Sequence, residues 1–111
     1  MSKLLRIIYE AIDEKKGENI IAYDFSSFNP FIDEVIITSV SNLKQVYAIA
    51  DNVCDRVKEH GYNVRSMEGN KDSRWILVDL DTVIAHIFLH EERDIYQLER
   101  LWSDLPKINL E

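Results

Sequence analysis

WILVDLDTVIAHIF, residues 75–88, is the stretch that decides the fold of this chain. It contains two runs rich in β-branched and other apolar residues, Trp75–Asp79 and Val83–Phe88, and both are typical of β-strands. Only residues 80–82 separate the two runs. Because a parallel crossover needs about a dozen residues or more, so short a connection predicts an antiparallel hairpin.

The segments before the hairpin predict two further strands and a long helix. The strands are expected at Asn19–Phe25 and Glu34–Ser39, joined by a short irregular connection. From Ser41 to Val57 the apolar residues recur at three- and four-residue steps, which is the period of a helix. Ser41 is a good N-cap for this helix, and Gly61 is a good stop.

Helices are also predicted at the two ends of the chain. The first lies between Ser2, a suitable N-cap, and Gly17, a plausible stop. A third strand is expected at Asn63–Glu68, and a final helix covers Glu91–Trp102. The apolar side of this last helix holds Ile95, Leu98, Leu101 and Trp102.

The predicted order of elements is therefore α-β-β-α-β-β-β-α. This order predicts an α/β fold with a mixed five-stranded sheet flanked by helices. No repeat and no Pro/Gly-rich linker divides the chain, so residues 1–111 are expected to form a single domain.

The charge balance bears on the kind of partner. The chain has 20 Asp and Glu residues against 13 Lys and Arg, a formal net charge of -7. Such a surface repels phosphate, which disfavours sequence-independent binding to DNA or RNA. A basic protein partner is favoured instead, because opposite fields speed and orient the encounter.

Cysteine usage and hydropathy bear on the cellular compartment. Cys54 is the only cysteine, so an internal disulfide is impossible, and we expect it to be a small buried hydrophobic residue. No segment approaches the length of a membrane span, and the N-terminal apolar residues are interrupted by charges. We therefore expect no membrane association and a cytoplasmic location, or an organelle matrix.

Two arrangements of reactive residues could indicate an enzyme. Asp79 and Asp81 form a D-x-D pair, which on a strand would suit a divalent metal in nucleotidyl transfer. No glycine-rich phosphate-binding run accompanies the pair, and Asp81 falls in the predicted turn. A metal site from His86, His90 and Glu91 would lose helical geometry, because the strand ends between the histidines. We expect no catalytic residue, metal or cofactor.

Three blocks of the sequence carry a resemblance to a known family. They are SNLKQVYAIADNV at Ser41–Val53, EG at 68–69 followed by Trp75–Phe88, and ERDIYQLERLW at Glu92–Trp102. The last block contains the pattern R-x-x-Y-x-L-E-x-L-W. In this order and spacing, over about 90 residues, the blocks resemble the ribosomal silencing factor (RsfS/Iojap) family.

The resemblance implies a fold, a partner and a mechanism. The family's sheet is nucleotidyltransferase-like, but the implied role is not enzymatic. Family members bind ribosomal protein fourteen of the large ribosomal subunit, a basic protein, at the face that meets the small subunit. Occupying that face sterically blocks subunit association and represses translation. An acidic docking surface would suit such a partner.

The sequence also departs from the family pattern. Asp81 and Thr82 replace a common Gly and Asp in the hairpin turn, Glu34 and Val35 replace aromatic residues, and Ser39 replaces a common Gly. We expect these changes to alter local surface chemistry more than the fold. They keep open an alternative function, a protein-interaction module of the same fold whose partner is not ribosomal.

Nine residues of the hairpin and the last helix are candidates for partner binding, because aromatic and charged side chains dominate interface energetics. They are Trp75, Asp79, His86, Phe88, Glu91, Arg93, Tyr96, Glu99 and Trp102. Packing against the sheet is the competing interpretation, and it is favoured for Phe88 and Trp102. For His86, inside an apolar strand, a hydrogen-bonded structural role is favoured.

The charged candidates also have a structural alternative. Arg93 and Asp79 could form an internal pair that fixes the last helix, and Glu99 could simply be solvated. Asp79 and Glu91 could instead meet cationic side chains of a partner. An aromatic patch that normally docks on a partner could also be buried in a homodimer when the partner is absent.

Overall fold

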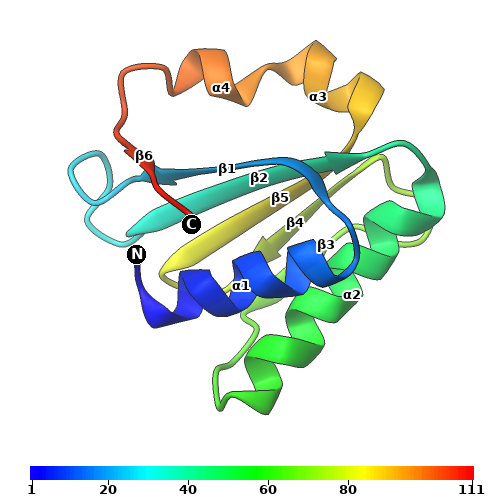
Figure 1. The fold of residues 1–111 in the computed structure, drawn as a ribbon, viewed down its shortest axis with the longest axis horizontal. Coiled ribbons are helices and arrows are strands. Elements are labelled where there is room, and N and C mark those ends of the chain that lie inside the picture. Colours follow the sequence, from blue (N-terminus) through cyan, green and yellow to red (C-terminus); the bar gives the residue numbers. More distant parts are fainter.

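The computed structural model describes residues 1–111 and places the predicted hairpin inside a six-stranded sheet (Figure 1). The strands are β1 (Glu18–Asp24), β2 (Glu34–Val40), β3 (Ser66–Glu68), β4 (Trp75–Asp79), β5 (Val83–Leu89) and β6 (Lys107–Ile108). Their order across the sheet is β3-β4-β5-β2-β1-β6. Only β2 and β5 are parallel neighbours, so the sheet is mixed, as predicted.

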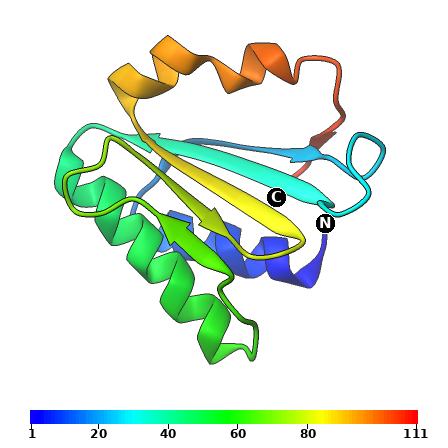
Figure 2. The same ribbon diagram turned by 180° about the vertical axis from the view of Figure 1, so that it is seen from behind.

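Helices cover both faces of the sheet (Figures 1 and 2). They are α1 (Lys3–Glu14), α2 (Leu43–Glu59), α3 (His90–Tyr96) and α4 (Leu98–Leu101). The pair α1 and α2 packs on one face, and the C-terminal pair α3 and α4 lies across the other (Figures 1 and 2). The α/β class predicted from the order of elements is confirmed.

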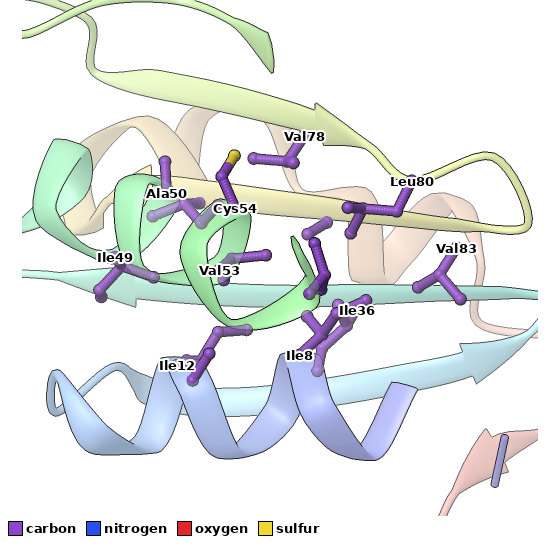
Figure 3. Close-up of a cluster of buried hydrophobic side chains, with 14 of the residues drawn as sticks. Ile8, Ile12, Ile36, Ile49, Ala50, Val53, Cys54, Val78, Leu80 and Val83 are labelled. Atoms are coloured by element: carbon purple, nitrogen blue, oxygen red, sulfur yellow. The ribbon is translucent and has the colours of Figure 1, made fainter. Parts of the chain in front are cut away.

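The main core lies between the sheet and the α1–α2 pair (Figure 3). Twenty-two buried residues form this cluster, among them Ile8, Ile36, Ile49 and Val53. Burying each such side chain contributes roughly 1.5–3 kcal/mol, so this cluster is the main source of stability. Cys54 belongs to it, as predicted, and burial raises the pKa of its thiol.

The helix ends follow the capping signals closely. Ser2 caps α1, because its side chain accepts a hydrogen bond from the Leu5 N–H at 3.0 Å. The N-cap of α2 is Asn42 and not the predicted Ser41; the Asn42 side chain accepts from the Gln45 N–H at 3.0 Å. Gly61 follows α2 with a φ of 86°, a conformation that glycine adopts without strain.

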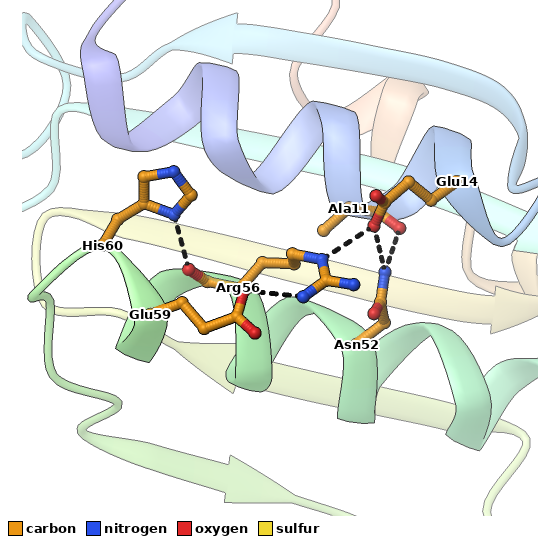
Figure 4. A network of polar contacts seen from close by, with 6 residues as sticks. All are labelled: Ala11, Glu14, Asn52, Arg56, Glu59 and His60. Carbon is orange, nitrogen blue, oxygen red and sulfur yellow. Dashed lines mark hydrogen bonds and ion pairs between the residues drawn. The ribbon is translucent and has the colours of Figure 1, made fainter.

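A polar network joins α1 to α2 on the face away from the sheet (Figure 4). The amide of Asn52 donates to the Ala11 carbonyl at 2.8 Å and to Glu14 at 2.9 Å. Arg56 also donates to Glu14, at 3.0 Å. These hydrogen bonds, that of Asn52 first, lower the pKa of the Glu14 carboxyl. The network sets the register of the two helices.

Three expectations about the elements were wrong. The sheet has six strands instead of five, because residues 107–108 return to pair with β1. The strand expected at Asn63–Glu68 is only three residues long. The last helix is broken at Gln97, whose φ of 47° divides α3 from α4.

The break at Gln97 also changes which residues of the last segment are buried. Leu98 and Trp102 pack on the sheet, as predicted, whereas Ile95 and Leu101 are 68% and 73% exposed. For Ile95 the reason is geometric, since it precedes the break and Leu98 follows it, so the two residues belong to different helices and do not share one face.

Three of the five departures from the family pattern lie in the interior, whereas Asp81 and Thr82 are exposed in the hairpin turn. Glu34, Val35 and Ser39 are all buried, because β2 is a central strand with helices over both faces. The Glu34 carboxylate accepts hydrogen bonds from the backbone N–H of Ser2, at 3.1 Å, and from its hydroxyl. The expectation of altered surface chemistry at these positions was therefore wrong.

None of the helices is both long and apolar enough to span a membrane.

Candidate functional site

A run of aromatic rings crosses the sheet face that α3 and α4 cover, and we call it the aromatic belt. In spatial order its members are Tyr96, Trp75, Phe88, His86, Trp102, Phe25 and Phe28. Neighbouring ring centroids lie between 4.8 and 6.2 Å apart. The belt runs through the second, smaller core of the protein, to which Phe25 and Phe88 belong, and both of its ends reach solvent.

The belt begins where β4 and the end of α3 meet. Trp75 lies opposite Phe88 in the antiparallel register of β4 and β5, and their rings stack at 4.8 Å. Tyr96 packs on the other side of Trp75, also at 4.8 Å. Phe88 is only 1% exposed, whereas Tyr96 is 52% exposed and Trp75 is half-buried. The structure therefore places one buried core residue, Phe88, beside two residues that a partner can reach, Trp75 and Tyr96.

Trp75 is held in place by a hydrogen bond to a buried histidine. Its indole Nε1–H donates to the Nδ1 of His86 at 3.1 Å. Because Nδ1 accepts, the proton of neutral His86 lies on Nε2. Burial among aromatic rings lowers the pKa of His86 to about 4. His86 is thus a structural residue that orients the exposed edge of Trp75.

We expect the stability of the protein to depend on the protonation of His86. Its pKa is depressed in the folded state, so the unfolded chain binds more protons between pH 4 and about 6.5. The stability contributed by neutral His86 is complete above about pH 6.5 and is lost as the pH falls toward 4. Over this range the free energy of unfolding should fall by about 3 kcal/mol. Urea unfolding of wild type and His86→Gln across this range measures the difference. The exposed His60, changed to Gln, is the control and should keep the wild-type slope.

Arg93 anchors the C-terminal helices to the sheet. It is 6% exposed, and its Nη1 donates to the Ser39 hydroxyl at 3.0 Å and reaches the Glu18 carbonyl at 3.5 Å. Its Nε donates to Glu99 at 3.2 Å. The second oxygen of Glu99 is buried without a hydrogen-bond partner. The charge of this carboxylate is therefore compensated by Arg93 alone.

The prediction of an internal pair between Arg93 and Asp79 was wrong. Arg93 follows the end of β5, whereas Asp79 lies opposite Ile84 near the start of that strand. The two side chains are therefore at opposite ends of the sheet, and Arg93 pairs with Glu99 instead. Glu99 is accordingly more than a solvated surface residue.

Part of β4 is left uncovered by α3 and α4. Alternate residues of the strand, Ile76 and Val78, point into the main core, and the others point to the aromatic face. Trp75, Leu77 and Asp79 are each partly exposed on that face, and we call them the β4 strip. Leu77 was missed among the candidate residues, although the alternation of the strand places it between Trp75 and Asp79.

The remaining candidates lie at the edges of this surface. Glu91 is exposed on α3, the helix that ends in Tyr96. Trp102 is half-buried, with its ring 5.8 Å from His86 and 5.0 Å from Phe25. Packing, the interpretation favoured for Trp102 and Phe88, is what the structure shows for both.

The D-x-D pair forms part of a turn. Asp79 accepts a hydrogen bond from the Asp81 N–H at 2.9 Å, and Asp81 has a φ of 75°. The Asp79 carboxylate therefore shapes the hairpin connection, as short polar side chains commonly do, and Asp81 occupies the turn position with positive φ. No group of three or more His, Cys, Asp or Glu side chains is arranged to hold a metal ion.

Comparison with known proteins gives a consistent result. The family model described as "Ribosomal silencing factor during starvation" matches residues 1–111. The ribosomal silencing factor RsfS of Bacillus subtilis is 40% identical over 108 residues, covering 97% of this chain and 92% of that protein. The RsfS of Halalkalibacterium halodurans is 36% identical over 109 residues, covering 98% and 93%. A crystal structure of a Chromobacterium violaceum protein has a TM-score of 0.88 at 31% identity, covering 93% of this chain and 88% of that one.

Proposed function

This chain belongs to the ribosomal silencing factor (RsfS) family, and we propose that it docks on the large ribosomal subunit through ribosomal protein fourteen of that subunit. Docking sterically blocks association with the small subunit and so represses translation. The mechanism is binding and exclusion, with no catalytic step. A protein that acts on ribosomes of the cytosol works in the cytoplasm, which is the location we propose.

The observation that carries this proposal is the half-exposed aromatic pair at the start of the β4 strip. Trp75 and Tyr96 contact each other and remain accessible, as interface anchors do. The hydrogen bond from Trp75 to His86 and the stacking on Phe88 hold the pair in one conformation. Such preorganisation lowers the entropic cost of binding.

The charge around this pair suits a basic partner. Glu68 lines a cavity of about 230 Å³ together with Trp75 and Leu77. Glu91 and Asp94 are exposed on α3. With a net charge of -7, the protein presents an acidic surface that is complementary to a basic ribosomal protein and unfavourable for RNA.

Co-sedimentation with separated ribosomal subunits tests the proposal. We expect the purified protein to pellet with large subunits and not with small ones. Added to both subunits, it should reduce the fraction of joined ribosomes as magnesium is raised. Absence of binding to either subunit would contradict the proposal and favour a protein-interaction module with a non-ribosomal partner.

We expect the double change Trp75→Ala with Tyr96→Ala to weaken binding to the large subunit by at least about 30-fold, because two anchor residues are removed. Subunit binding measured by titration gives the value, and circular dichroism checks that the domain stays folded. Tyr47→Ala, which removes a half-buried tyrosine from α2 on the opposite face, is the matched control. Equal binding by wild type and the double variant would place the docking surface elsewhere.

The same pair provides a surface for self-association. When no ribosome is present, a homodimer that buries Trp75 and Tyr96 would remove apolar area from water. Sedimentation equilibrium of the free protein tests this part of the proposal, and Tyr96→Ala should shift the protein toward monomer.

A further inference from the structure

The loop between β1 and β2 presents the most exposed aromatic residue of the protein. Phe31 is 81% exposed, and Phe28 is 65% exposed. The loop is nevertheless held by its own hydrogen bonds. The Phe25 N–H donates to the Asp33 carbonyl at 2.7 Å, and the Asn29 side chain accepts from the Phe31 N–H at 2.8 Å. Phe31 is therefore displayed to solvent by an ordered backbone.

A cavity of about 620 Å³ lies between this loop and the β4–β5 hairpin. Phe31 and Ile84 contribute apolar surface to it, and Asp79 and Asp81 contribute carboxylates. Arg65 is the only basic residue that lines it, and its contact with Asp81, at 3.7 Å, joins two mostly exposed side chains. Exposed pairs of this kind are weak. Asp79 makes no ion pair, so its carboxylate is available to an incoming cation.

The cavity is continuous with the surface assigned to docking. Asp79 is the last residue of the β4 strip, whose first residue, Trp75, contacts Tyr96. The four residue steps from Trp75 to Asp79 along an extended strand span about 13 Å, a distance well within one protein–protein interface. A partner that contacts Trp75 and Tyr96 therefore reaches the cavity along the strip.

We propose that this cavity receives a basic side chain, arginine or lysine, from the protein partner on the large ribosomal subunit. The inference rests on the proposed function and assigns a second anchor to it. The aliphatic stem of the incoming residue packs on Phe31, and its charged head pairs with Asp79 and Asp81. A phosphate group would be repelled by these carboxylates, and a second copy of this acidic chain brings like charge to the same place.

Two single changes test the cavity. Phe31→Ala and Asp79→Asn should each weaken binding to purified large subunits about tenfold, a typical loss for an interface anchor. The asparagine keeps the oxygen that accepts from the Asp81 N–H, so the hairpin turn is preserved. Asp55→Asn makes the same change in net charge on the exposed side of α2 and serves as the control. Both test variants should have the same midpoint of urea unfolding as the wild-type protein.

The dependence of binding on salt separates a direct ion pair from a general effect of charge. Asp79→Asn should flatten the decrease of affinity with rising salt, whereas Asp55→Asn should leave the wild-type slope. If wild type binds, Tyr96→Ala weakens binding, and both cavity variants bind as wild type does, the cavity proposal is overturned while docking stands. If wild type itself fails to bind large subunits, the proposed function fails, and the cavity proposal fails with it.

Discussion

Replacing Phe88 by alanine should lower the free energy of unfolding by about 3–5 kcal/mol, the usual cost of truncating a fully buried aromatic residue. Phe88 is 1% exposed and lies in the middle of the aromatic belt, stacked on Trp75 at 4.8 Å. Its removal leaves a cavity between β5 and the C-terminal helices. Loss of the Phe88 ring also removes the stacking contact that orients Trp75.

Urea unfolding followed by circular dichroism measures the effect of Phe88→Ala. Phe31→Ala is the matched control, because the same side chain is removed from a position that is 81% exposed. The control should change the free energy of unfolding by less than about 0.5 kcal/mol. A loss below about 1 kcal/mol for Phe88→Ala would contradict the packing of Phe88 and revive its interpretation as an interface residue.

Replacing Arg93 by alanine should lower the free energy of unfolding by about 3 kcal/mol, because breaking a buried pair leaves its partners unsatisfied. The change removes hydrogen bonds to Ser39 and to the Glu18 carbonyl, and it leaves Glu99 without its only charged partner. Arg93→Lys should recover little of this loss, since one ammonium group cannot reach the three acceptors of a guanidinium.

The effect of Arg93→Ala should be concentrated in the C-terminal segment. Amide hydrogen exchange is expected to increase most in α3 and α4, which Arg93 fastens to β2. Arg100→Ala, at an exposed position of α4 that forms no ion pair, is the control and should exchange as wild type does. Uniform loss of protection across the sheet would instead assign Arg93 to the main core.

Local patterns were enough to find most of the elements. The apolar runs of β4 and β5 and the three residues between them predicted the hairpin, with β4 bounded as expected at Trp75–Asp79. Helical spacing predicted α2, and the cap at Ser2 predicted the start of α1. These features depend on neighbours within about seven residues of each other, so the sequence contains them directly.

The candidate site was predictable in most of its residues but only partly in their roles. Trp75, His86, Phe88 and Trp102 were singled out, and the structure brings them together in one belt. The sequence favoured packing for Phe88 and left packing and partner binding both open for Trp75, although both residues lie on the same face of the sheet. Their difference depends on where α3 and α4 lie over the strands.

By itself the sequence determined the α/β class, the hairpin, the long helix and the acidic charge of the surface. Only the tertiary structure decided that the last helix breaks at Gln97, that Arg93 pairs with Glu99 and not with Asp79, and that Phe31 faces an acidic cavity. The physical reason is the range of the interactions. Period and capping act between near neighbours, whereas burial and ion pairing join residues that only the packing of the sheet brings together.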